Sequence, residues 1–350
     1  MKKSTERKSN GGMAKGIDRP GKPGMVSLGL FINGIKGLLS RFSLWVERLS
    51  EEQFCFLLLS PLLLLLAVII GVPLLRTIWV SFHQYLPTKP WLEYKFIGLV
   101  NYIFLLKDPI FLAALLHSFY FTVLNIVFIL LFAMVGAFLA SKQTKGKAII
   151  RTALLVPWAT PIAIAGMTFR LMYSSEHGVI NYLLKTGGFI EEYIPWLLSY
   201  SHVFDWMYSA IAMNAIIVAA VWRNIPISTL LLLAALESIP SEYYKVAKVN
   251  GANTWQIFRH ITFPLIMPAM TVVVLWRAIT AMRIYGIIET MTGGGPGRLT
   301  ETLQLLTIRT FYTEKNIGKG SAVATLTMIF TFLIILAYLA FIQYMEKRRK

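Results

Sequence analysis

Four arginines lie inside hydrophobic stretches of this sequence, where a charge is costly. Arginine at the centre of a membrane-spanning helix costs roughly 2.5–3.5 kcal/mol on insertion scales, so such residues usually serve a function. A guanidinium group could hydrogen-bond the hydroxyls of a polar solute or meet an anionic group. Arg223 and Arg277 could instead bond neighbouring helices or free carbonyl groups. The polar residues in these stretches are Arg170, Arg223, Arg277 and Arg283, with Asn125 and Asn214.

The sequence lacks the motifs of an enzyme. It has no G-x-x-x-x-G-K-[ST] phosphate loop, no H-E-x-x-H motif, no nucleophile elbow and no paired carboxylates inside the hydrophobic runs. GGGPGR at 293–298 lacks the lysine and hydroxyl residue that a phosphate loop needs. The single cysteine, Cys55, excludes a disulfide or Cys-based metal site, and the five histidines show no ligand spacing. We therefore expect no catalytic residue, metal or cofactor, and ATP, if used, must bind a separate subunit.

The composition indicates an integral membrane protein. Of 350 residues, 56% are hydrophobic and 15% are charged, and the mean hydropathy is +0.62. Soluble domains carry about a quarter charged residues. A net charge of +17 could indicate nucleic-acid binding. However, Lys and Arg gather at the termini and at the ends of hydrophobic runs, where orientation in the bilayer explains them. We expect an all-α membrane protein that binds no nucleic acid.

The chain divides into three parts. Residues 1–27 are basic and rich in Gly and Pro, so we expect a disordered cytoplasmic segment. Residues 28–52 place apolar side chains at helical spacing among charges, which predicts an amphipathic helix on the membrane surface rather than a further span. Residues 53–350 form the transmembrane domain. Six runs there are long enough to cross ~30 Å of hydrocarbon: 54–75, 110–140, 152–169 (bent by Pro157 and Pro161), 207–236, 261–288 and 321–344.

The distribution of positive charge predicts the orientation. An even number of spans places both termini on one side of the membrane. Of 34 Lys and Arg, 21 lie in the terminal segments and in the loops at 141–151 and 237–260, whereas 9 lie in the opposite loops. The positive-inside rule therefore places both termini and the loop at 238–262 in the cytoplasm of a multi-pass plasma-membrane protein.

A polar stretch, SEYYKVAKVNGANTWQIFRHITFPLIMP at 241–268, separates the fourth and fifth spans. Asn250-Gly251 supplies a helix stop, because Gly readily takes the left-handed conformation that closes a helix. Asn253, with Gln256 three residues later, predicts a capping box that starts a new helix. The loop is therefore expected to be two short helices joined at a tight corner, stiff enough to transmit force.

This stretch resembles the EAA coupling loop of binding-protein-dependent ABC permeases, roughly E-A-A-x-x-x-G, nine residues, then I-x-L-P. Three positions depart from that pattern: Lys245 stands where Glu is usual, Val246 where the first Ala stands, and Asn250 where Asp is common. The resemblance implies that the loop docks on an ATPase. The docking residues would be Lys245, Ala247, Asn250, Gly251, Ala252, Phe258 and Pro264.

Other segments are similar to those of carbohydrate-uptake permeases and follow in family order. The Gly-Pro segment resembles that of the maltose-permease-like member of the usual pair. The segments are FIGLVNYIFLLKDPIF at 96–111, LLVPWATPIAIAGMTFRLMY at 154–173, GVINYLL at 178–184, WRNIPISTLLLLAALESIP at 222–240 and TGGGPGRLTETL at 292–303. With the loop, they identify the chain as a member of the permeases of ABC sugar importers.

The resemblance implies the six-helix type I ABC importer permease fold and a sugar or related polyol as substrate. It implies a second permease subunit (a heterodimer), a dimer of cytoplasmic ATPases and an extracytoplasmic solute-binding protein. It also places 281–288 and the region around Trp222 on the solute pathway. Tyr285 could stack on a sugar face, and Gly286 stands where relatives often carry Asp. The pathway candidates are Trp222, Arg223, Arg277, Arg283, Tyr285 and Gly286.

An ion-coupled secondary transporter is the alternative function. Such carriers usually place Asp or Glu near the bilayer midplane to bind the coupling ion. The spans here have no central acid, and Glu289 lies near an external end. A passive channel subunit is a third possibility, although nothing resembles a selectivity filter.

Overall fold

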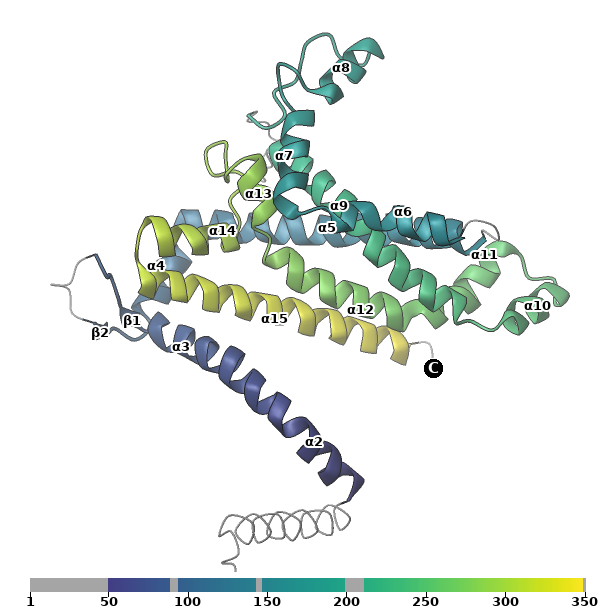
Figure 1. Cartoon of the computed structure of the whole chain (residues 1–350), viewed down its shortest axis with the longest axis horizontal. Helices are drawn as coiled ribbons and strands as arrows, with labels where there is room; N and C mark the ends of the chain where they lie inside the picture. The colour runs from purple at the N-terminus through teal and green to yellow at the C-terminus, as the bar shows by residue number, and fades with distance from the viewer. Residues whose placement is uncertain (1–49, 89–93, 143–146, 199–210, 349–350) are drawn as a thin grey trace, which may run out of the picture. The chain divides into compact units, whose positions relative to one another are not determined.

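The computed structural model describes residues 50–88, 94–142, 147–198 and 211–348 (Figure 1). The predicted disordered segment and all but the last three residues of the predicted amphipathic helix lie outside these ranges. Those last residues belong instead to the cap and first turn of a hydrophobic helix, α2, which begins at Glu51. Residues Met1–Val72 and Pro73–Lys350 form two compact units, which are described separately.

The described part of the first unit is a hydrophobic helix. α2 (Glu51–Leu66) starts with a capping box, in which Ser50 and Gln53 each accept a hydrogen bond from the other's backbone N–H. It continues into the π-helix η1 (Ala67–Gly71). From Phe54 to Gly71 the segment carries no charged residue, which suits a membrane-spanning helix.

The described residues of the second unit are helical apart from one small hairpin and the connecting loops. In that hairpin β1 (His83–Gln84) and β2 (Lys95–Phe96) pair antiparallel, with His83 opposite Phe96. The helices are α3 (Val72–Ser81), α4 (Val100–Lys107), α5 (Pro109–Lys142), α6 (Lys147–Ala159), α7 (Ile162–Met172), α8 (Val179–Thr186), α9 (Ile211–Glu237), α10 (Ser241–Val249), α11 (Thr254–Ile257), η2 (Phe258–Thr262), α12 (Phe263–Met282), α13 (Gly286–Met291), α14 (Leu303–Ile308), η3 (Arg309–Thr313) and α15 (Ile317–Lys347).

Helix α5 packs against α9 and α12 through small residues. Ala133, Ala137 and Ala140 recur on one face of α5 and are buried against leucines of α9 and against Ile266 and Val273 of α12. Gly136 lies on the same face, and a Cβ there would come within 3.1 Å of the Thr229 side chain. Small residues let helix backbones approach closely, which is the main source of helix association in lipid.

The spans agree with the sequence prediction in number but not in shape. Among the described residues, five helices are long and apolar enough to span a membrane, and the bent pair α6–α7 gives a sixth when it is counted as one span. The bend is 88° and falls at Thr160–Pro161, so α7 runs across the direction of α6 in Figure 1. The prediction of an unbroken fifth span to residue 288 is wrong. Helix α12 ends at Met282, and α13 begins at Gly286.

A buried ion pair holds the loop between α13 and α14. The Glu301 side chain is 1% exposed, and its Oε1 accepts a hydrogen bond from Arg309 Nη1 at 2.9 Å. Arg309 Nη2 donates to the Gly293 carbonyl at 2.6 Å, and the partly exposed Arg298 lies 3.5 Å from the second carboxylate oxygen. Burial raises the pKa of the Glu301 carboxyl above its ordinary value, although both arginines act to lower it.

Removing the inner arginine should destabilise the protein strongly. We expect Arg309→Met to lower the free energy of unfolding by roughly 3 kcal/mol, because it leaves a carboxylate buried without its main partner. The deficit should shrink as the pH falls. A carboxyl whose pKa is raised on folding binds a proton more readily in the folded state, and protonation removes the unpaired charge. Denaturant unfolding of the detergent-solubilised protein at several pH values measures both effects.

The outer arginine supplies a matched control. Arg298→Met removes a more exposed partner of the same carboxylate and should cost less than about 1 kcal/mol. Adding Glu301→Gln to Arg309→Met should recover part of the stability. Equal losses for the two arginine variants would contradict the assignment of Arg309 as the main partner.

Candidate functional site

The predicted two-helix corner is present in the loop at 238–262. Helix α10 closes with the Gly251 N–H bonded to the Lys248 carbonyl and the Ala252 N–H bonded to the Ala247 carbonyl, both at 3.0 Å. These two bonds form a Schellman motif. Gly251 has a φ of +76°, which only Gly adopts readily, and a Cβ there would meet nothing within 4 Å. Glycine is therefore required here by backbone conformation and not by lack of space.

The second helix starts and joins the bundle through side-chain contacts. Asn253 Oδ1 accepts from the Gln256 N–H, and Gln256 Oε1 accepts from the Asn253 N–H, both at 2.8 Å, as the predicted capping box requires. Phe258 packs edge-on against Phe138 of α5 with ring centroids 5.9 Å apart. Pro264 is the second residue of α12 and follows directly on the π-helix η2. The loop is thus anchored to α5 and continuous with α12.

The outer surface of α10 carries apolar side chains in a polar loop. Tyr243, Val246 and Val249 are exposed, Val249 by 87%. Lys245 is also exposed, and its Nζ lies 3.9 Å from Glu242, a contact that contributes little in water. Exposed apolar groups on a rigid projection are typical of a protein-contact surface.

Two pathway candidates lie at the break between α6 and α7. The Nε of Arg223, on α9, donates a hydrogen bond to the carbonyl of Thr160 at 3.2 Å. Trp222 is partly exposed, and its ring meets Phe169 of α7 edge-on at a centroid distance of 5.3 Å. Arg223 therefore bonds a backbone carbonyl, the alternative that the sequence left open.

Arg277 is a buried cation on α12. Its side chain is 3% exposed and stacks on the Trp276 ring, 4.0 Å from the centroid. Its Nε has no hydrogen-bond partner among the residues that the structure describes. A buried donor without a partner is energetically costly, and this nitrogen is enclosed within the chain rather than exposed to a pathway.

The remaining candidates surround the break between α12 and α13. Arg283 ends α12 and is exposed, while Tyr285 caps α13 and packs, half-buried, against the core. Gly286 faces α7, since a Cβ there would lie 2.9 Å from the Ile162 side chain. At Gly166 of α7 a Cβ would meet the Thr290 side chain. Helices α7 and α13 thus pack closely, which brings the two breaks together.

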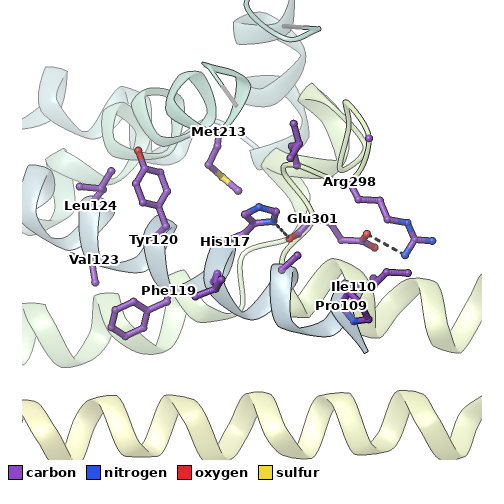
Figure 2. Close-up of a pocket in the computed structure, with 14 residues that line it drawn as sticks. Pro109, Ile110, His117, Phe119, Tyr120, Val123, Leu124, Met213, Arg298 and Glu301 are labelled. Carbon is purple, nitrogen blue, oxygen red and sulfur yellow. Dashed lines mark hydrogen bonds and ion pairs between the residues drawn. The ribbon is translucent and has the colours of Figure 1, made fainter. Parts of the chain in front are cut away.

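Sequence reasoning missed a pocket of about 630 Å³ along the first half of α5 (Figure 2). The loop at 297–301 closes one end of it, where His117 Nδ1 donates to the Glu301 carbonyl at 3.1 Å. The lining is otherwise mainly apolar, which does not suit a sugar with its many hydroxyls. In the sequence this site was marked only by His117, which is the only residue among Asp, Glu, His, Lys and Arg in the 110–140 run.

Asn181 was also not predicted. It is fully buried in α8, and its amide makes four hydrogen bonds, two of them with the backbone of Ile194 at 3.0 and 3.2 Å. The other two reach the Ser174 carbonyl at 3.3 Å and Trp196 Nε1 at 2.8 Å. One side chain therefore fixes the segment between α7 and residue 196.

Comparison with known proteins gives consistent matches. Residues 129–350 match the family described as binding-protein-dependent transport system inner membrane component. The chain is 33% identical over 296 residues to the trehalose/maltose transport system permease protein MalF of Thermococcus litoralis, covering 83% of this chain and 94% of that protein. It is 32% identical over 305 residues to the sulfoquinovosyl glycerol transport system permease protein SmoG of Agrobacterium fabrum, covering 87% and 95%.

A solved structure shares the fold. It is a crystal structure of a bacterial ABC transporter involved in the import of the acidic polysaccharide alginate. The TM-score is 0.68 at 18% sequence identity, and the match covers 88% of this chain and 99% of that chain. The predicted all-α fold of the type I importer permeases is therefore confirmed.

The corner at Gly251 should open when its left-handed residue is replaced. Gly251→Val places a β-branched side chain at a φ that L-residues avoid by roughly 1–2 kcal/mol. We expect amide hydrogen exchange at residues 251 and 252 to accelerate about tenfold, since the Schellman bonds open together. Gly188→Val is the matched control, because Gly188 has a φ of +72° and equally open surroundings in a distant loop. Acceleration at residues 251 and 252 in that control would refute the local explanation.

Proposed function

Since the chain belongs to the family of binding-protein-dependent transport system inner membrane components, we propose that it is the permease subunit of an ATP-driven importer for a sugar or related polyol. Both similar permeases are named for glycosides, trehalose/maltose and sulfoquinovosyl glycerol. The observation that carries the proposal is the rigid corner at Gly251, presented with exposed apolar side chains in a chain of this family.

The energy comes from separate ATPase subunits that dock on α10 and α11. The sequence has no phosphate loop of its own, so ATP binds elsewhere. When two ATPases close on ATP, the docking loop follows them, because its Schellman motif and capping box leave it little freedom to bend. The movement passes directly into α12, whose helix continues from η2 without a gap. The solute cavity then opens to the other side of the membrane.

The solute pathway follows the two helix breaks. Trp222, Arg283 and Tyr285 are exposed or half-buried there. Aromatic rings and guanidinium groups together suit a sugar, which offers an apolar face and a rim of hydroxyls. A second permease subunit supplies the opposite wall, and a solute-binding protein delivers the sugar from outside.

ATP dependence tests this function against an ion-coupled transporter. Proteoliposomes that hold the chain, its partner permease and the ATPases, supplied with binding protein, should take up labelled maltose or trehalose only with ATP on the ATPase side. Tyr285→Ala should lower uptake at least fivefold without loss of the assembled complex, since it removes a stacking ring worth roughly 1 kcal/mol. Uptake driven by an ion gradient without ATP would establish the alternative.

The orientation follows from the positive charge and is tested by labelling. With Cys55 replaced by Ser, a cysteine at Val249 should resist an impermeant maleimide applied to intact cells. A cysteine at Phe189 should react, because this 79% exposed side chain lies in a loop on the opposite side of the membrane. Permeabilised cells should label at both positions. Reaction at Val249 in intact cells would reverse the orientation.

A further inference from the structure

Hydrogen bonds join α6 to α9 near both ends of α6. At the docking-loop end, Arg151 Nη2 donates to both carboxylate oxygens of Glu237, at 2.6 and 2.8 Å. At the other end, Arg223 Nε holds the carbonyl of Thr160, the residue that follows α6. The two helices also pack against each other. They are therefore joined as a pair over the length of α6.

The ion pair between Arg151 and Glu237 lies next to the docking loop. Glu237 is the last residue of α9, and α10 starts at Ser241. Two of the three residues between them remain hydrogen-bonded to α9, since the Ser238 N–H donates to the Ala234 carbonyl at 3.1 Å and the Ile239 N–H donates to the Leu236 carbonyl at 3.3 Å. A displacement of α10 therefore acts on the end of α9 through a short connection, and on α6 through Arg151.

The position of this ion pair is poor for helix stability. Glu237 is the last residue of α9, where the helix dipole favours a cation rather than a carboxylate. Both side chains are partly exposed, at 40% and 36%. Such pairs contribute little to folding. A partly exposed pair that opposes the dipole of α9 indicates a role in geometry rather than in stability.

Beyond the hydrogen bond from Arg223 to Thr160, the chain is free to bend. Pro161 has no N–H to continue the hydrogen bonds of α6, and α7 starts anew at Ile162 after the 88° turn. Helix α7 packs on α13 as well as on α9. Pro157 lies within α6 without ending it, so the sharp change of direction falls at Thr160–Pro161, next to the bond to Arg223.

We propose that Arg151, Glu237 and Arg223 are positioning residues that make α6 and α9 follow the docking loop as one body. The conformational change during transport then occurs at the Thr160–Pro161 break and in α7 and α13, which lie beyond it. This inference rests on the proposed function, because the loop transmits a displacement only if an ATPase docks there.

Charge exchange tests the pair separately from stability. Arg151→Glu or Glu237→Arg places like charges together and should lower sugar uptake per ATP hydrolysed about fivefold in the reconstituted complex. The double exchange restores an ion pair and places a cation at the C-terminal end of α9, so it should fold about as well and recover uptake per ATP to within about twofold. Glu176→Arg, at an exposed position outside the docking loop and both breaks, is the control and should have no effect. Failure of the double exchange to recover coupling, with the complex assembled, would overturn the proposal.

A tether tests whether the two helices move together. In a Cys55→Ser background, Arg151→Cys with Glu237→Cys removes the ion pair and should lower uptake per ATP. A short bifunctional thiol reagent that joins the two cysteines should restore it. Uptake that stays low or stops after cross-linking, while each single-cysteine variant tolerates the reagent, would show that the helices must separate. Loss of ATP-driven uptake by the unmodified complex would instead refute the proposed function.

Discussion

Backbone groups released by a broken helix must find new partners inside the membrane, and this requirement shapes the centre of the molecule. At the first break the Thr160 carbonyl accepts a hydrogen bond from Arg223. At the second, the Ile284 carbonyl accepts one from Thr302 Oγ1 at 3.2 Å. Each break is therefore satisfied by a side chain from a distant part of the sequence. Without these donors, α7 and α13 could not leave the direction of the helices that precede them.

The two breaks depend on one another through close packing. A Cβ at Gly166 would collide with Thr290, and one at Gly286 would crowd Ile162, so α7 and α13 approach more closely than larger residues would allow. A change in the direction of α7 therefore displaces α13 and the Tyr285 that caps it. The hydrogen bonds that satisfy the backbone and the contacts around the proposed solute pathway therefore move together.

Local chemistry made the docking loop predictable from sequence, whereas the solute pathway depended on distant contacts. Asn250-Gly251 and the Asn253–Gln256 pair act within a few residues, and both hold in the structure. Hydropathy located the spans but could not end α12 at Met282, because the residues after the break are equally apolar. Asn181 makes its hydrogen bonds to residues 7 to 15 positions away, and Arg223 bonds a carbonyl 63 positions away. Such contacts depend on tertiary packing, so the periodicity of the sequence does not reveal them.

The corner at Gly251 is held by backbone hydrogen bonds, while Lys245 and Val246 point their side chains outward. Shape and partner choice are therefore encoded in separable parts of the same loop. In the proposed docking, substitutions at Lys245 and Val246 on the outer face of α10 change which ATPase is recognised without refolding the corner. A permease with such a loop can come to use a different ATPase through surface substitutions alone. Importers can therefore diversify while the backbone structure of the docking loop stays the same.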